Sequence, residues 1–323
     1  MKVDEKIVAL RGDRTLQHRG AQRMESARAQ WLAGELSPLI EAEIGRLASG
    51  EAMEQLPHLR RLLGEYETAS GFVEGFLASF VDGLRDEPLG LVPCSHSCHD
   101  GLTIVRLFSH GGVDLSLIAY ANRREGDPPT STIFADRWVR EIVIAGKGTA
   151  LLHRLGQSSS GDCSISSRTI RLGPGSKLDL PDHRSSRQIV GAEGGLVVLQ
   201  LSCTPDWPRP TREHCLADGR MLRQACGSKA VSQQEIALAV LGALKRKDAV
   251  PAMAALAVEG PPHLRWEAIR HTIALEPLAG VRALTVTAAR EGDELALPAA
   301  QLRAQLFAAY PQLAEVDTNA CRA

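Results

Sequence analysis

The chain has 323 residues, of which 44% are hydrophobic and 23% are charged, so its composition is that of a folded globular protein and excludes a disordered chain. Its 37 basic and 38 acidic residues give a formal net charge of −1, which provides no overall positive field for binding a nucleic acid backbone. The length predicts two or three units, each with its own core.

The N-terminal segment mixes charges of both signs through a short apolar run and lacks the apolar core of a signal peptide. The sequence contains no run of about 18 apolar residues, the length that a membrane-spanning helix requires. We therefore expect a cytoplasmic protein with no membrane partner. The seven cysteines are scattered along the chain, which favours reduced thiols over a disulfide framework.

Residues 26–84 follow a helical pattern and predict three or four helices in an N-terminal region of residues 1–90. Phe72, Phe76 and Phe80 recur at intervals of four, so they share one helix face. Because no polar cluster accompanies this aromatic stripe, we interpret it as part of a core.

After Pro88 the pattern changes to short runs rich in β-branched residues, separated by clusters of Gly, Pro, Asp and Ser. A hairpin is predicted across Gly111–Gly112, since consecutive glycines supply the positive φ angles of tight turns. Further strands are predicted at 131–135, 138–144, 149–155, 164–171, 176–180, 185–190 and 195–202. This spacing is typical of an antiparallel barrel or jelly roll, which we place over residues 91–228.

A last hairpin is predicted around Asp218–Gly219, after which the chain becomes helical. Ser232 and Glu235 form a capping-box pattern that predicts a helix start. The apolar face of that helix consists of Ile236, Val240, Leu241 and Leu244.

Residues 229–323 are predicted to form a C-terminal helical domain with two related helix pairs, roughly 248–274 and 277–311. This part resembles HEAT-type helical repeats, which implies a scaffold or interaction surface. A helical cap on the β domain is the alternative.

The segment Glu141–Gly148 resembles the second half of the first motif of the cupin family, in which two histidines precede a glutamate and a glycine turn. The histidine positions fall on Phe134 and Asp136, or on Ala135 and Arg137 with a shorter spacing.

The segment Gly175–His183 is similar to the second cupin motif, in which a turn, a strand and a proline precede a glycine and a histidine. Ser186 occupies the histidine position here, and His183 occupies the glycine position. The resemblance implies a cupin-like jelly roll, and together with the helical patterns on either side it predicts an α+β multidomain protein whose central antiparallel β jelly roll is flanked by N-terminal and C-terminal helical regions.

A cupin metal site gathers about three imidazoles and a carboxylate, whereas this chain keeps the carboxylate of Glu141 alone. We therefore expect no cofactor. The alternative is a non-standard set of Glu141, His153 and His183 that holds Fe, Mn, Ni or Zn and oxidises or isomerises a small substrate.

Strand alternation places Arg137, Val139, Glu141 and Val143 on one face, so an inward Glu141 needs a partner for its buried charge. Arg137 is either that internal partner or, together with Glu141, a polar anchor for a small organic ligand. The candidate ligand-binding residues are Arg137, Glu141, His153 and His183.

The segment 94–99 contains two thiols and two imidazoles, which invites a metal interpretation through Cys94, His96, Cys98 and His99. Structural zinc sites usually take ligand pairs from two separated segments, and no second pair is present in the sequence. We interpret this segment as an incidental loop and expect no metal there.

The leading functional hypothesis is a non-catalytic cupin-like module that binds a small molecule or a protein partner. The alternatives are the metal-dependent enzyme and an interaction scaffold built on the C-terminal helices. A homodimer paired through barrel edges is compatible with the resemblance.

Overall fold

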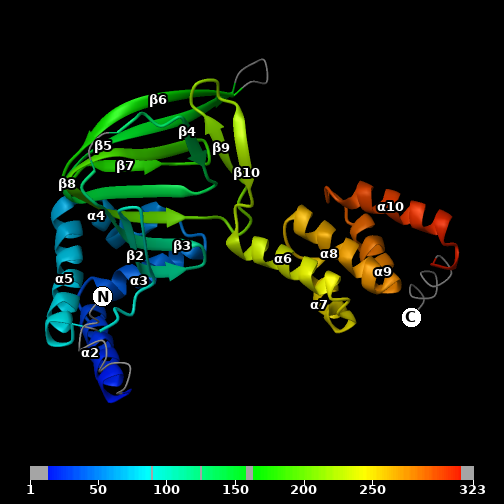
Figure 1. Cartoon of the computed structure of the whole chain (residues 1–323), viewed down its shortest axis with the longest axis horizontal. Helices are drawn as coiled ribbons and strands as arrows, with labels where there is room; N and C mark the ends of the chain where they lie inside the picture. Colours follow the sequence, from blue (N-terminus) through cyan, green and yellow to red (C-terminus); the bar gives the residue numbers. More distant parts are fainter. Residues whose placement is uncertain (1–13, 89, 124–125, 158–162, 314–323) are drawn as a thin grey trace, which may run out of the picture. The chain divides into compact units, whose positions relative to one another are not determined.

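A computed structural model of the chain describes residues 14–88, 90–123, 126–157 and 163–313. The chain divides into two compact units, Met1–Ala225 and Cys226–Ala323 (Figure 1). Within the described residues, no helix has both the length and the apolarity needed to cross a bilayer.

The first unit begins with helices that are joined by short connections. They are α2 (Arg14–Leu32), α3 (Ser37–Ala48), the short 3-10 helix η1 (Met53–Gln55), α4 (Pro57–Gly64) and α5 (Tyr66–Asp86). Prolines at the starts of α3 and α4 suit the first helical turn, where the missing N–H has no intrahelical partner.

The rest of the first unit is an antiparallel β domain in which every paired strand runs antiparallel to its neighbour. Its large sheet has the order β1-β2-β3-β8-β5-β6, with β7 also paired to β5, and a smaller sheet has the order β10-β9-β4. The strands are β1 (His96–His99), β2 (Leu102–His110), β3 (Val113–Tyr120), β4 (Ser131–Phe134), β5 (Trp138–Gln157), β6 (Cys163–Leu172), β7 (Lys177–Leu180), β8 (Ser185–Cys203), β9 (Thr211–Cys215) and β10 (Met221–Ala225).

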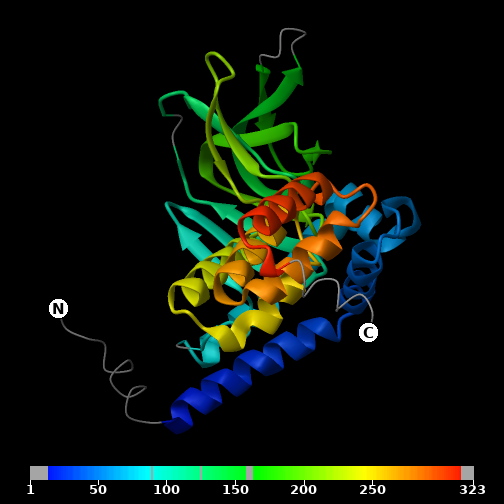
Figure 2. The same cartoon turned by 90° about the vertical axis from the view of Figure 1, so that its right-hand side faces the viewer.

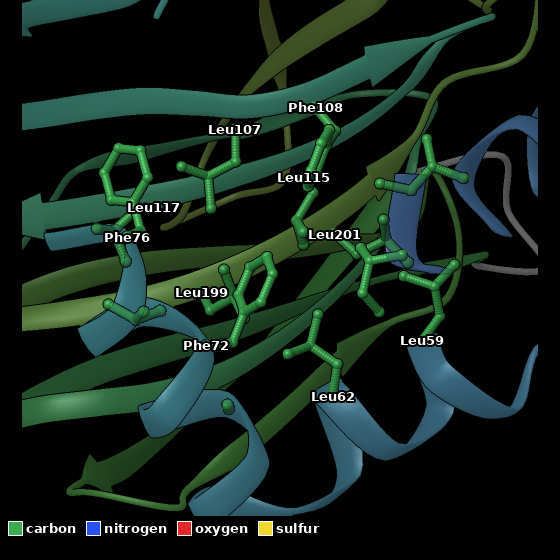
Figure 3. Close-up of a cluster of buried hydrophobic side chains, with 14 of the residues drawn as sticks. Leu59, Leu62, Phe72, Phe76, Leu107, Phe108, Leu115, Leu117, Leu199 and Leu201 are labelled. Atoms are coloured by element: carbon green, nitrogen blue, oxygen red, sulfur yellow. The ribbon is translucent and has the colours of Figure 1, made fainter. Parts of the chain in front are cut away.

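The helices of the first unit cover one face of the large sheet and form its main core. Figure 3 shows Phe72 and Phe76 of α5 and Leu59 and Leu62 of α4 packed against sheet residues that include Leu199. The aromatic stripe predicted from the sequence is buried in this cluster. Because side chains alternate along β5, Ile142 and Ile144 face the helices and their neighbours face the opposite side.

The predicted α+β architecture, with an antiparallel β domain between two helical regions, is confirmed. The prediction that glycine turns divide residues 138–155 and residues 185–202 into two strands each is wrong. Residues 138–144 and 149–155 belong to the single strand β5, and residues 185–190 and 195–202 belong to the single strand β8. At Gly146 the β5–β8 pairing contains a bulge in which Gly194 and Gly195 of β8 are the extra residues, and such extra residues bend a strand without ending it. The two hairpins across Gly111–Gly112 and Gly219 are present as predicted.

The second unit is helical (Figure 2). It contains α6 (Lys229–Ala243), the 3-10 helix η2 (Lys247–Ala249), α7 (Val250–Leu256), α8 (Pro262–Leu275), α9 (Pro277–Ala288) and α10 (Ala296–Ala309). Its core contains Val231 and Leu238 of α6 and Leu264, Ala268 and Ile269 of α8.

Two predictions about α6 are wrong. The helix begins one turn earlier than the capping box indicated, because Ser228 is the N-cap and its hydroxyl accepts the backbone N–H of Val231 at 3.3 Å. The predicted apolar face is also largely exposed, since Ile236, Val240 and Leu244 point away from the core that Leu238 enters.

Candidate ligand-binding pocket of the β domain

A cavity of about 290 Å³ lies on the face of the large sheet that is opposite the helices, and residues of both sheets line it. Its apolar wall consists of Ile133, Ala135, Val139 and Leu180. Its polar wall consists of Arg137, Glu141, Ser185, Ser186, Arg187, Gln188 and Gln200. Polar groups that converge opposite an apolar wall can orient a small molecule that has both apolar and polar parts.

Glu141 of β5 is the central polar residue of this cavity, with only 1% of its side chain exposed. Its Oε1 atom accepts a hydrogen bond from Nη2 of Arg187 at 2.6 Å and another from the amide of Gln200. Both donors lie on β8, which pairs with β5 along its length. The partner expected from the sequence, Arg137, is exposed and lines the cavity without making this contact.

The Glu141–Arg187 pair is only partly satisfied. Among the described residues, neither Oε2 of Glu141 nor Nε of Arg187 has a hydrogen-bond partner, although both atoms are buried. Buried polar atoms without partners are uncommon in folded proteins, and each costs about 1–3 kcal/mol of desolvation. The pair therefore leaves one acceptor and one donor without partners in two residues that line the cavity.

Arg187 is a permanently charged group in a buried setting. Burial alone would lower the pKa of its guanidinium, but the carboxylate of Glu141 and the hydroxyl of Tyr120 raise that pKa above its ordinary value. Nη1 of Arg187 donates to the Tyr120 hydroxyl at 3.0 Å, and the guanidinium lies 5.7 Å from the centre of the tyrosine ring. The cavity thus contains a fixed positive charge.

Ser186, at the position where the resemblance implies a histidine, has a structural role. Its hydroxyl donates to the carbonyl oxygen of Ile133 at 2.7 Å and lies 2.9 Å from the hydroxyl of Thr132. Both partners belong to β4, so Ser186 connects the large sheet to the small one.

The structure does not bring His153 and His183 together with Glu141. His153 is buried outside the cavity, with Nδ1 2.8 Å from the Ser167 hydroxyl and Nε2 2.9 Å from Oε1 of Gln188. His183 lies before β8, and its Nε2 accepts from Nη1 of Arg209 at 3.1 Å. Two of the four candidate residues, Arg137 and Glu141, therefore line the cavity.

His153 should make the stability of the protein depend on pH. Burial lowers the pKa of its imidazole, so its neutral form contributes stability above the ordinary histidine pKa of about 6.5 and loses that contribution as the pH falls through the lower folded value. When the pH is lowered from about 7.5 to about 5.5, a range that spans the ordinary histidine pKa, we expect the unfolding temperature of His153→Gln to fall less than that of the wild type. The exposed His110→Gln variant should retain the wild-type dependence in thermal unfolding followed by circular dichroism. Equal pH dependence of the wild type and His153→Gln would contradict this assignment.

A divalent transition metal does not fit the cavity. Its lining residues, all described in the structure, include one carboxylate and neither histidine nor cysteine. The Arg187 guanidinium already neutralises Glu141 at 2.6 Å, and its charge would repel a cation placed there. The donor set lacks the imidazoles that iron, manganese or nickel sites favour.

Within the segment 94–99, residues 96–99 form an edge strand instead of the predicted loop. His96–His99 are the exposed strand β1, in which alternation separates His99 from His96 and Cys98. Burial raises the pKa of the Cys94 thiol, which disfavours the thiolate that a metal requires. Among the described residues, these side chains do not gather three ligand atoms.

No protein-family model matches the sequence, and no curated protein matches it. Solved structures that are similar to about a third of the chain include two whose names describe a cupin domain. Ectoine synthase from P. lautus is 14% identical over 34% of this chain and 69% of its own, with a TM-score of 0.24. A cupin domain from Bordetella pertussis is 14% identical over 33% of this chain and 98% of its own, with a TM-score of 0.23. KdgF from Halomonas sp. is 16% identical over 35% of this chain and 90% of its own, with a TM-score of 0.24.

Proposed function

We propose that the β domain is a non-catalytic binding module for a small hydroxylated organic molecule. The observation that supports this function is the half-satisfied ion pair, in which Oε2 of Glu141 and Nε of Arg187 lack partners beside a cavity. A ligand hydroxyl can donate to a carboxylate oxygen and accept from a guanidinium N–H at the same time. A hydroxylated ligand at this wall would supply the kinds of partner that these two atoms lack.

The size and charge of the cavity narrow the ligand class. About 290 Å³ is at the small end of ligand pockets, which suits a compact molecule such as a short polyol or a hydroxy acid. The charged lining residues are Arg137, Glu141 and Arg187, so the described lining carries one net positive charge. This balance favours a neutral or singly negative ligand over a cation.

A binding role explains the polar residues better than catalysis does. Oε1 of Glu141 is held by Arg187 and Gln200, and the described lining of the cavity contains no second carboxylate and no histidine, cysteine, lysine or tyrosine that could serve as a partner acid or base. The metal-dependent alternative requires Glu141, His153 and His183 to converge, and these residues make separate contacts.

Ligand screening on the full chain tests the proposal. Thermal shift against a panel of polyols, hydroxy acids and matched deoxy compounds should identify binders among the hydroxylated members, with affinity confirmed by calorimetry. Ile133→Trp, at an exposed lining position, should reduce that affinity by about tenfold or more because it fills the cavity, since every 1.4 kcal/mol is tenfold. Met221→Trp, exposed on β10 outside the cavity, is the matched control and should bind normally. Equal effects of the two variants, or equal binding of the deoxy compounds, would reject this function.

A further inference from the structure

We propose that the second unit holds a zinc ion through Cys226, Glu235 and His263. The sulfur of the cysteine, a carboxylate oxygen of the glutamate and a ring nitrogen of the histidine all lie within 4.8 Å of one another. The three side chains come from separate positions: Cys226 precedes α6, Glu235 is in α6 and His263 is in the first turn of α8. This inference is independent of the pocket in the β domain.

The distance between the donor atoms of Glu235 and His263 matches the distance between two ligands of a tetrahedral zinc ion. Zinc–nitrogen and zinc–oxygen bonds of about 2.1 Å at a tetrahedral angle place the two ligand atoms about 3.4 Å apart, and a zinc–sulfur bond of about 2.3 Å places sulfur and nitrogen about 3.6 Å apart. Nε2 of His263 lies 3.4 Å from Oε1 of Glu235. This separation is longer than the usual hydrogen bond of about 2.9 Å and equals the separation that a shared ion requires. The thiol sulfur lies within 4.8 Å of both atoms, so an approach of at most about 1.2 Å would bring it to the separation that a shared zinc ion requires.

The backbone positions of these ligands are fixed by the helical core. Cys226 is partly buried and packs against the core cluster of the second unit, and the start of α6 is fixed by the Ser228 cap. His263 precedes Leu264, which is fully buried in the same cluster. Ligands that are carried by packed helices are held close to their binding geometry before the ion arrives.

The donor types select zinc, and their exposure indicates an open site. A thiolate with an imidazole favours zinc over magnesium or calcium, which prefer oxygen ligands alone. Three protein donors leave a fourth position, and the His263 and Glu235 side chains are 51% and 34% exposed, so water can reach it. The structure therefore favours an exchangeable zinc ion with a solvent ligand over a closed structural site.

Cobalt substitution of the full-length, reduced and metal-free protein tests this site. We expect one equivalent of Co²⁺ to bind with a thiolate-to-cobalt charge-transfer band and the intense d–d bands of a four-coordinate ion, and Zn²⁺ to displace it. Cys226→Ser should abolish the charge-transfer band. Glu235→Gln should weaken zinc binding by about 100-fold, because it removes a direct ligand, and the loss of a residue that only hydrogen-bonds to a ligand already lowers metal affinity by about 10–100-fold. Cys98→Ser, which removes an exposed thiol between two histidines, is the matched control and should leave the spectrum unchanged.

Alkylation supplies a second readout that does not depend on cobalt. Zinc should protect Cys226 from iodoacetamide in the wild type, as measured by peptide mass spectrometry, and should fail to protect it in the folded Glu235→Gln variant. Circular dichroism verifies that each variant is folded. A six-coordinate cobalt spectrum without a thiolate band, loss of the band in Cys98→Ser alone, or unprotected Cys226 in zinc-loaded protein would each overturn the proposal.

Discussion

Replacing Arg187 with alanine is expected to lower the free energy of unfolding of the first unit by about 3–5 kcal/mol, since this is the usual cost of removing one partner of a buried ion pair. The Glu141 carboxylate, which is 1% exposed in the wild type, would lose the Arg187 guanidinium and keep Gln200 as its observed donor. Urea denaturation followed by circular dichroism measures the change. The same variant should lose binding of the hydroxylated ligand, because the free donor at Nε is removed.

Two comparisons separate the buried pair from ordinary surface charge. Arg154→Ala breaks an ion pair of similar length, 2.9 Å to Asp182, whose side chains are 49% and 34% exposed, so its cost should be about 1 kcal/mol or less. The double variant Arg187→Met with Glu141→Gln removes both charges and should recover most of the stability that Arg187→Ala loses. If Arg187→Ala costs no more than Arg154→Ala, the pair is not desolvated as described.

The large elements of the fold could be predicted because each has a local signal. The aromatic stripe of α5 and the glycine hairpin between β2 and β3 follow from spacing alone, and both are present. The continuity of β5 and β8 could not be predicted, because a glycine pair that bends a strand at a bulge has the same sequence pattern as one that ends it. The capping-box pattern at Ser232 and Glu235 placed the start of α6 one turn too late, because Ser228 is the N-cap in the structure.

The candidate pocket could be predicted in part. Strand alternation placed Glu141 on the inner face and required a cationic partner, which is what the structure contains. The sequence suggested Arg137 because it is near in the chain, whereas the partner is Arg187, brought in by the register between β5 and β8. The sequence contained a signal for Arg187, because this residue directly follows Ser186, the position at which the resemblance implies an inward-facing histidine. The group of Cys226, Glu235 and His263 gave no signal, because three single residues of different segments form no motif.

Replacing Gly146 with alanine is expected to destabilise the first unit by about 3 kcal/mol or more, at the upper end of the cost of a strained backbone position. Gly146 has a φ of +83°, and a Cβ built on it would lie 1.9 Å from the carbonyl oxygen of Gly195. The clash cannot be relieved by a side-chain rotation, because the opposing atom is backbone of the paired strand β8. Thermal and urea unfolding measure the loss.

Alanine substitutions at two other glycines distinguish the destabilisation caused by the steric clash from that caused by the positive φ angle. Gly194 has a φ of +69° and no atom within 4 Å of a built Cβ, so alanine there should cost only the backbone strain of about 1–2 kcal/mol. Gly173 has neither a positive φ nor a neighbour, and alanine should be tolerated. The order of losses should therefore be Gly146, Gly194, Gly173. Because Gly146 sits at a bulge between Glu141 and the rest of β5, its substitution should also weaken ligand binding. If Gly146→Ala and Gly194→Ala lose equal free energies of unfolding, the close approach of the two strands at Gly146 is dispensable.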